Sequence, residues 1–221
     1  MHVVAVVVAG SEHAITPVAD VPMVVRAVRT LLAGAPVEHV TVVAADSLRP
    51  EIERVCVGVP VRVRSPSALH GIGAHTVQRQ GATGSDDLVT SSGDGIVLLH
   101  DACRPLAPVE LVTAVVEAVG DGHGMAVPTL PLTDTVKSVD DRGAVTGTPD
   151  RAGFRVLQTP IAVRAGMLTA DACANPVAEV RRYTAAGGEV WTVAGHPAAF
   201  AVRSDWDLEL AELIADGRIR L

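Results

Sequence analysis

Short apolar runs rich in β-branched residues recur along this chain and alternate with segments of helical periodicity. The apolar runs cover Val3–Val8, Val37–Val43, Val59–Val63, Ile96–Leu99 and Met125–Val127. The helical pattern covers Met23–Leu32, Leu48–Arg54, Gly73–Gln80 and Val109–Val119. Strands that alternate with helices form βαβ units, whose crossovers place helices against a parallel sheet. The pattern predicts an α/β fold with a mostly parallel sheet and helices on both faces.

The composition agrees with such a sheet and with a single domain. Apolar residues make up 48% of the chain but aromatic residues only 2%, so the core must consist of Val, Ala, Leu and Ile. Residues of this kind suit parallel strands that are buried on both faces. A length of 221 residues allows one α/β domain or two very small ones. Because no repeat or linker interrupts the chain, we expect one domain over residues 1–221.

The alternation stops between Pro128 and Gln158. This stretch has short β-type runs, a DDRG turn signal and no helical period. We interpret residues 131–159 as a β-arm that reaches away from the sheet; an ordinary surface hairpin is the alternative. Further along, the pattern predicts helices at Val163–Ala170 and Val177–Ala185, a strand at Glu189–Val193, and a terminal helix that begins at Asp205.

Charge and cysteine content exclude several classes of protein. The formal net charge of −7 argues against a surface that binds nucleic acid or an anionic membrane. The cysteines, Cys56, Cys103 and Cys173, are odd in number and far apart, which argues against a disulfide framework and a zinc knuckle. The opening apolar run is too short to span a bilayer and lacks the features of a signal peptide, so we expect a cytoplasmic protein.

A buried strand runs directly into titratable residues in the segment VLLHDACRPL, residues 97–106. Ligands of open parallel sheets bind at the carboxyl ends of the strands. Asp101 therefore stands where a phosphate-bound Mg²⁺ could bind, since Mg²⁺ prefers one or two carboxylates together with substrate oxygens. Arg104 could neutralise phosphate or hold Asp101 in a structural ion pair. His100 is expected to pack or cap, because histidines at such positions do so more often than they catalyse.

The turn after the first strand, VVVAGSE, is the expected place for a nucleotide-binding loop. It contains neither the dinucleotide fingerprint nor the Walker pattern. Backbone N–H groups around Gly10 and Ser11 could still hold phosphate. Serine-hydrolase and zinc motifs are missing, and no cysteine has local activating features.

Three ordered motifs, HDACRP, AVPTLPLTDTVK and RAGFRVLQTP, resemble those of the 2-C-methyl-D-erythritol 4-phosphate cytidylyltransferases of isoprenoid biosynthesis. The resemblance covers nearly the whole chain. It implies a Rossmann-like nucleotidyltransferase sheet with a β-arm that hooks around a second subunit in a homodimer. It also implies a reaction in which the phosphate of the polyol substrate attacks the α-phosphorus of CTP and pyrophosphate leaves, with Mg²⁺ and cationic side chains stabilising the anionic transition state.

The resemblance also implies roles for individual residues. Asp101 becomes the metal ligand and, with Arg151, a candidate catalytic residue. The candidate nucleotide-binding residues are Gly10, Ser11, Thr76 and Asp101. The candidates for holding the phosphorylated substrate are Thr135, Arg151 and Thr159, with arm residues serving the neighbouring subunit's site.

Several cationic residues of the family pattern are replaced. Val18 and Ala201 stand where the family has lysines, Gly73 stands at an arginine position, and His13 lies near another. Lys137 is the only lysine in the chain. We expect Val18 to lie in a solvated loop at the carboxyl edge of the sheet.

The family's acidic run before GGEV is also lost, and an ungapped match falls on VAEVR, residues 177–181. Arg203, two positions after Ala201, could compensate in part for the lost cations. Three interpretations stay open: a cytidylyltransferase with impaired or altered activity, a non-catalytic relative that keeps the fold and the dimer, and a nucleotidyltransferase for another polyol phosphate.

Overall fold

The computed structural model describes residues 2–66, 95–168 and 175–221 and contains an eight-stranded central sheet. Its strands are β1 (Val3–Ala9), β4 (Val37–Ala44), β5 (Val61–Arg64), β6 (Ile96–Asp101), β7 (Met125–Pro131), β10 (Arg155–Leu157), β11 (Ile161–Arg164) and β12 (Val190–Ala194). They lie in the order β10-β7-β11-β6-β1-β4-β5, with β12 paired to β7. Strands β1, β4, β5 and β6 are mutually parallel neighbours, whereas β11 runs antiparallel to β6 and β7. The mostly parallel sheet is therefore confirmed.

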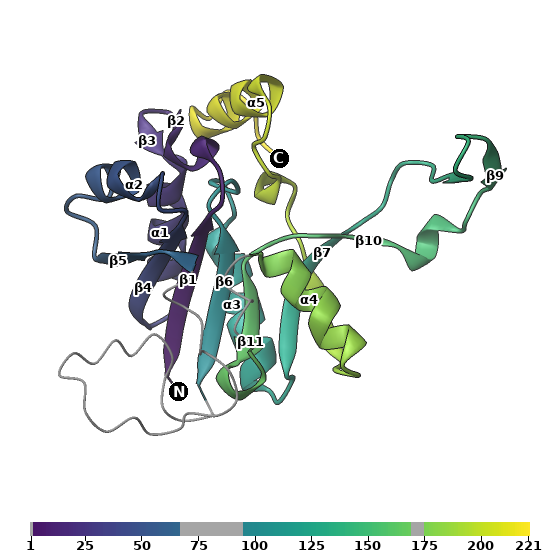
Figure 1. Ribbon diagram of the computed structural model, residues 1–221, viewed down its shortest axis with the longest axis horizontal. Helices are drawn as coiled ribbons and strands as arrows, with labels where there is room; N and C mark the ends of the chain where they lie inside the picture. Colours follow the sequence, from purple (N-terminus) through teal and green to yellow (C-terminus); the bar gives the residue numbers. More distant parts are fainter. Residues whose placement is uncertain (1, 67–94, 169–174) are drawn as a thin grey trace.

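Helices cover both faces of this sheet, as predicted (Figure 1). They are α1 (Met23–Gly34), α2 (Arg49–Val55), α3 (Val109–Gly120), α4 (Pro176–Ala185) and α5 (Asp205–Ala215). Alternate residues of β1 face opposite sides: Val3 and Val7 pack with α1, α2 and α3, whereas Val4 and Val6 pack with α4. Helix α5 lies at the carboxyl end of the sheet (Figure 1). None of the helices in the described ranges is long and apolar enough to cross a membrane.

Most predicted elements agree with the structure to within a few residues, but the predicted helix at Val163–Ala170 is wrong. Ile161–Arg164 form strand β11 instead, followed by a short 3-10 turn at Ala165–Met167. The apolar residues of β11 are fully buried, with Val163 paired to both Val97 and Met125. Because β11 pairs with a strand on each side, its backbone N–H and C=O groups form hydrogen bonds within the sheet. This stabilisation outweighs the local preference for a helix. The predicted helix Gly73–Gln80 lies outside the described residues.

The segment between β7 and β10 projects from the body of the molecule (Figure 1). Its far end is a hairpin of β8 (Ser138–Val139) and β9 (Val145–Gly147). The predicted DDRG turn is confirmed: Asp140 accepts hydrogen bonds from its own turn, and Gly143 has a φ of 82°, which favours glycine. The arm exposes several large apolar side chains, namely those of Val139, Val145, Phe154 and Val156. The structure contains one chain, so dimerisation through residues 131–159 stays a prediction.

Candidate active site

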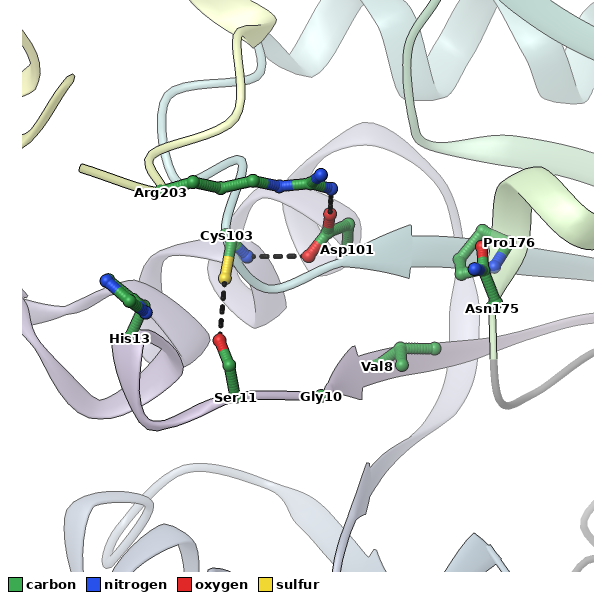
Figure 2. Close-up of a pocket in the computed structure, with 9 residues that line it drawn as sticks. All are labelled: Val8, Gly10, Ser11, His13, Asp101, Cys103, Asn175, Pro176 and Arg203. Carbon is green, nitrogen blue, oxygen red and sulfur yellow. Dashed lines mark hydrogen bonds and ion pairs between the residues drawn. The ribbon is translucent and has the colours of Figure 1, made fainter. Parts of the chain in front are cut away.

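A pocket of about 440 Å³ lies at the carboxyl ends of β1 and β6, on the face of the sheet that α4 covers (Figure 2). Val8 and Asp101 are register partners on these two strands, so their side chains enter the pocket together. The lining residues are Val8, Gly10, Ser11, His13, Asp101, Cys103, Asn175, Pro176 and Arg203. This is the edge of a parallel sheet at which ligands generally bind.

The carboxylate of Asp101 is held in a fixed position at the end of β6. Its Oδ1 accepts a hydrogen bond of 2.9 Å from the backbone N–H of Cys103, and its own N–H donates to Thr159 Oγ1 at 3.1 Å. The second oxygen, Oδ2, lies 3.3 Å from Nη2 of Arg203 (Figure 2). Asp101 therefore keeps one oxygen anchored to the backbone and turns the other toward a cation at the pocket.

Arg203 reaches Asp101 from the segment that enters α5. The preceding residue, Val202, is buried and donates its N–H to the Cys103 carbonyl at 2.7 Å, which joins this segment to the loop after β6. The N–H of Arg203 donates to Asp207 Oδ2 at 3.1 Å, inside the cap that Ser204 forms on α5. The Arg203 side chain is 68% exposed. It thus has a fixed backbone but a solvated guanidinium.

His100 precedes Asp101 on β6, so its side chain lies on the opposite face of the sheet. It is fully buried, and its Nδ1 lies 2.8 Å from the hydroxyl of Thr159, the same hydroxyl that receives the Asp101 N–H. Burial lowers the pKa of His100 to about 4, so the ring is neutral at physiological pH. The predicted packing role is confirmed: His100 and Thr159 together fix the backbone of Asp101.

Of the two roles expected for Arg104 from the sequence, the structural ion pair with Asp101 is wrong, whereas the neutralisation of phosphate stays a prediction. Its guanidinium donates to the carbonyl of Ala199 at 2.5 Å and to that of Leu157 at 3.4 Å. Among the described residues it has no ion pair with Asp101 and does not line the pocket. Burial lowers the pKa of Arg104 from its ordinary value. Arg104 therefore fastens the chain around Ala199 to the base of the arm.

The loop after β1 borders the pocket with three residues, Gly10, Ser11 and His13. A Cβ added to Gly10 would meet no atom within 4 Å, which leaves the backbone accessible to a ligand. The hydroxyl of Ser11 lies 3.7 Å from the Cys103 sulfur, and His13 lies exposed at the rim. Burial and the neighbouring carboxylate of Asp101 raise the pKa of the Cys103 thiol, so it is a poor nucleophile.

The prediction that Val18 lies in a solvated loop is wrong. It belongs to a hairpin of β2 (Pro17–Val18) and β3 (Val21–Pro22), and its side chain is 0% exposed. It packs in a small apolar cluster with Met23, Val202 and Ala211. The hairpin thus places Val18 in this cluster, and Val18 is not among the residues that line the pocket. Ala201, by contrast, is half-buried.

The structure brings together only some of the residues predicted from the sequence. Gly10, Ser11 and Asp101 line the pocket. Thr159 is hydrogen-bonded to Asp101 but is fully buried. Its hydroxyl contacts the Asp101 N–H and His100 Nδ1. Thr135 and Arg151 are exposed on the arm, where Arg151 donates to the carbonyl of Thr133. Thr76 and Gly73 lie outside the described residues.

Asn175 and Pro176 line the pocket but were not predicted from the sequence. The Asn175 side chain accepts hydrogen bonds from the N–H groups of Val177 and Ala178 and so caps α4, whose first turn borders the pocket. Asn followed by Pro ahead of a helical pattern is an ordinary helix-start signal. That signal was present in the sequence, although nothing local connected it to Asp101.

The pocket fits a divalent cation only if a substrate supplies most of its ligands. No group of three or more His, Cys, Asp or Glu side chains that could hold a metal occurs among the described residues. Asp101 offers one carboxylate oxygen toward an open pocket. Mg²⁺ is commonly bound by one or two carboxylates, water and substrate phosphates, so a Mg²⁺–nucleotide complex fits this donor set best, and a free divalent cation would bind here only weakly.

Comparisons with known proteins agree on one family. The family model for IspD, 2-C-methyl-D-erythritol 4-phosphate cytidylyltransferase, matches residues 6–216. The enzyme of that name from Nocardia farcinica is 38% identical over 220 residues, covering 96% of this chain and 89% of its own length. The corresponding protein of Streptomyces avermitilis is 36% identical over 217 residues, covering 93% of this chain and 84% of its own length.

Solved structures show the same fold. The 2-C-methyl-D-erythritol 4-phosphate cytidylyltransferase of Thermus thermophilus superposes with a TM-score of 0.70 at 26% identity, covering 98% of this chain and all of its own. A 4-diphosphocytidyl-2C-methyl-D-erythritol synthase from Anaerococcus prevotii gives a TM-score of 0.73 at 17% identity, covering 97% of this chain and 98% of its own, and supports the fold alone.

Proposed function

This chain belongs to the 2-C-methyl-D-erythritol 4-phosphate cytidylyltransferase family, and from that premise we propose that it binds CTP at the Asp101 pocket and transfers its cytidylyl group slowly. The observation that supports this proposal most directly is the anchored carboxylate of Asp101 at the carboxyl end of β6, opposite Arg203. The acceptor in this proposal is 2-C-methyl-D-erythritol 4-phosphate, as in the names of the relatives. The cytoplasmic location inferred from the opening residues stays a prediction.

The residues of the pocket would share the work of an in-line phosphoryl transfer. Gly10 and Ser11 offer backbone N–H groups to the phosphates, and Asp101 would hold Mg²⁺. The metal, when bound, neutralises charge that develops between the reacting phosphates. An oxygen of the acceptor phosphate attacks the α-phosphorus of CTP, the bond to the bridging oxygen breaks, and pyrophosphate leaves. The buried pair of His100 and Thr159 keeps the Asp101 backbone in place, which matters because positioning contributes most of the catalysis in such reactions.

The acceptor side of the site would come from a second copy of the chain. Thr135 and Arg151 lie on the projecting arm, which also exposes Val145 and Phe154. Apolar side chains presented on a hairpin of this kind gain stability when another surface covers them. We therefore propose a homodimer in which the arm of one subunit brings Arg151 to the pocket of the other.

The proposed activity is low because the pocket has few cations for a triphosphate. Among the described residues that line it, Arg203 is the one permanently charged cation, and it faces the negative charge of Asp101. The loss of one transition-state contact typically costs about 2.7–4 kcal/mol, which corresponds to roughly a hundred- to thousandfold in rate. Two lysine positions now hold Val18 and Ala201, so a rate reduced by at least that factor is expected.

A second candidate function is a non-catalytic relative that keeps the fold and the dimer. The burial of Val18 favours it, because a lysine packed in this apolar cluster could not extend to a phosphate without disrupting the packing. A third interpretation, transfer to another polyol phosphate, has no separate support in the pocket.

Two assays on the full-length protein separate these candidates. Calorimetric titration with CTP and Mg²⁺ tests binding, and pyrophosphate release with 2-C-methyl-D-erythritol 4-phosphate tests turnover. The proposed function predicts weak binding and slow turnover, both lost in Asp101→Asn. Binding without any pyrophosphate release would favour the non-catalytic relative. Absence of both binding and turnover would refute the proposed function.

A further inference from the structure

The free oxygen of Asp101 already has a cation beside it. Oδ1 accepts the hydrogen bond from the Cys103 N–H, which leaves Oδ2 without a backbone partner, and Oδ2 lies 3.3 Å from Nη2 of Arg203 (Figure 2). Asp101 itself is 21% exposed, whereas Arg203 is 68% exposed. The guanidinium therefore lies against the carboxylate oxygen that is not bonded to the backbone.

The backbone around Arg203 keeps its side chain near this oxygen. Val202 is buried and hydrogen-bonded to the Cys103 carbonyl, only two residues after Asp101. On its other side, Arg203 adjoins the capped N-terminus of α5. Both flanks of Arg203 are therefore fixed in the backbone, and Asp101 is the only ion-pair partner of its guanidinium among the described residues.

We propose that Arg203 is an internal competitor of the divalent cation at Asp101 and thereby sets the metal dependence of this pocket. This inference rests on the proposed role of Asp101 as metal ligand. A metal that binds Oδ2 must displace the guanidinium, because two cations cannot approach one carboxylate oxygen without strong repulsion. The displaced Arg203 remains at the pocket rim, where it can pair with a phosphate of the nucleotide.

This arrangement predicts a measurable penalty on metal binding by the free protein. An exposed ion pair of this kind is weak, so the metal can break it. Removal of the guanidinium abolishes both the competing contact and the direct repulsion between the two cations. We expect Mn²⁺, used as a probe for the divalent site, to bind Arg203→Gln at least about threefold more tightly than the unaltered protein.

The test is a Mn²⁺ titration of the full-length protein without nucleotide, followed by the electron paramagnetic resonance signal of free Mn²⁺ across the millimolar range. Arg203→Gln is the principal variant, and Arg203→Lys should keep most of the competition. Arg218→Gln is the matched control, because Arg218 is an exposed arginine beyond α5 with the same charge. The double variant Asp101→Asn with Arg203→Gln shows whether the gained affinity resides at Asp101.

The proposal predicts a gain in Arg203→Gln that is missing in Arg218→Gln and lost in the double variant. It is overturned when Arg203→Gln binds Mn²⁺ no better than the unaltered protein, when Arg218→Gln gains equally, or when the gain survives in the double variant. Calorimetric titration of the unaltered protein with CTP is read separately. If Arg203→Gln binds Mn²⁺ more tightly but the protein does not bind CTP, this inference stands and the proposed function is refuted. If the protein binds CTP but Arg203→Gln shows no tighter Mn²⁺ binding, the proposed function stands and this inference is refuted.

Discussion

Restoring the lysine of the family pattern at position 18 should destabilise the protein rather than repair it. The side chain of Val18 is fully buried and packs against Met23, Val202 and Ala211. Its carbonyl is also held, by a hydrogen bond of 2.9 Å from Nε of Arg26. The hairpin around Val18 is thus fixed on both its side-chain and its backbone side, and Val18→Lys would place an ammonium group inside an apolar cluster.

The expected cost follows from this burial. Removing one partner of a buried charge pair leaves an uncompensated charge and costs about 3–5 kcal/mol, and an unpaired lysine in this cluster is in the same situation. A small domain has a stability of about 5–15 kcal/mol, so the change removes a large part of it. Ala201 is half-buried, and Ala201→Lys can direct its ammonium group to solvent, for a cost below about 1 kcal/mol.

Urea unfolding followed by circular dichroism measures these differences in the free energy of unfolding. Val18→Met is the control for side-chain length, since a long apolar side chain at this buried position should cost about 1–3 kcal/mol through overpacking alone. The reasoning is refuted if Val18→Lys loses no more stability than Val18→Met. In that case the hairpin opens readily, and the first loop can reach the pocket after all.

Three further predictions concern the core, a turn and the arm. Because the pKa of His100 is about 4 when folded and about 6.5 when unfolded, the unfolded state binds more protons between these values. Stability should therefore fall by up to about 3 kcal/mol as the pH drops from about 6.5 to about 4 and level off below, and urea unfolding of His100→Gln should lack this component. Ala19 and Asp20 adopt positive φ angles of 43° and 61° without being glycine, so replacing them by Asn-Gly should raise the free energy of unfolding by about 1 kcal/mol; an unchanged value would exclude strain at this turn. Val145→Asp with Phe154→Asp should convert the proposed dimer to a monomer in sedimentation velocity, whereas a monomer before mutation would contradict the dimer itself.

Some of the site could be predicted because its cause is local in the sequence. The apolar run Ile96–Leu99 is followed by His100 and Asp101, and the end of a buried parallel strand is where a ligand site generally lies. The DDRG turn is similarly encoded by four adjacent residues. The capping signal of Asn175 was equally local but had no link to the pocket until the fold placed α4 beside β6.

Other features depend on contacts between distant segments and could not be predicted. The residues from Val163 onward have a helical pattern in the sequence. Val163 lies in a strand only because β11 pairs with β6 and β7. The sequence shows that Val18 replaces a cation, but not that a hairpin buries it against Val202, far along the chain. The same holds for Arg203, whose contact with Asp101 arises from the hydrogen bond that joins two loops about a hundred residues apart.

The central claim is that this member of the cytidylyltransferase family keeps the Asp101 pocket but has lost most of the cations that accelerate the reaction. Its most direct test is the rate of pyrophosphate release from CTP, with Mg²⁺ and 2-C-methyl-D-erythritol 4-phosphate, measured side by side with the Nocardia farcinica relative. We expect a rate at least about a hundredfold below that of the relative, abolished by Asp101→Asn. A rate equal to that of the relative, or one that persists in Asp101→Asn, would contradict the account.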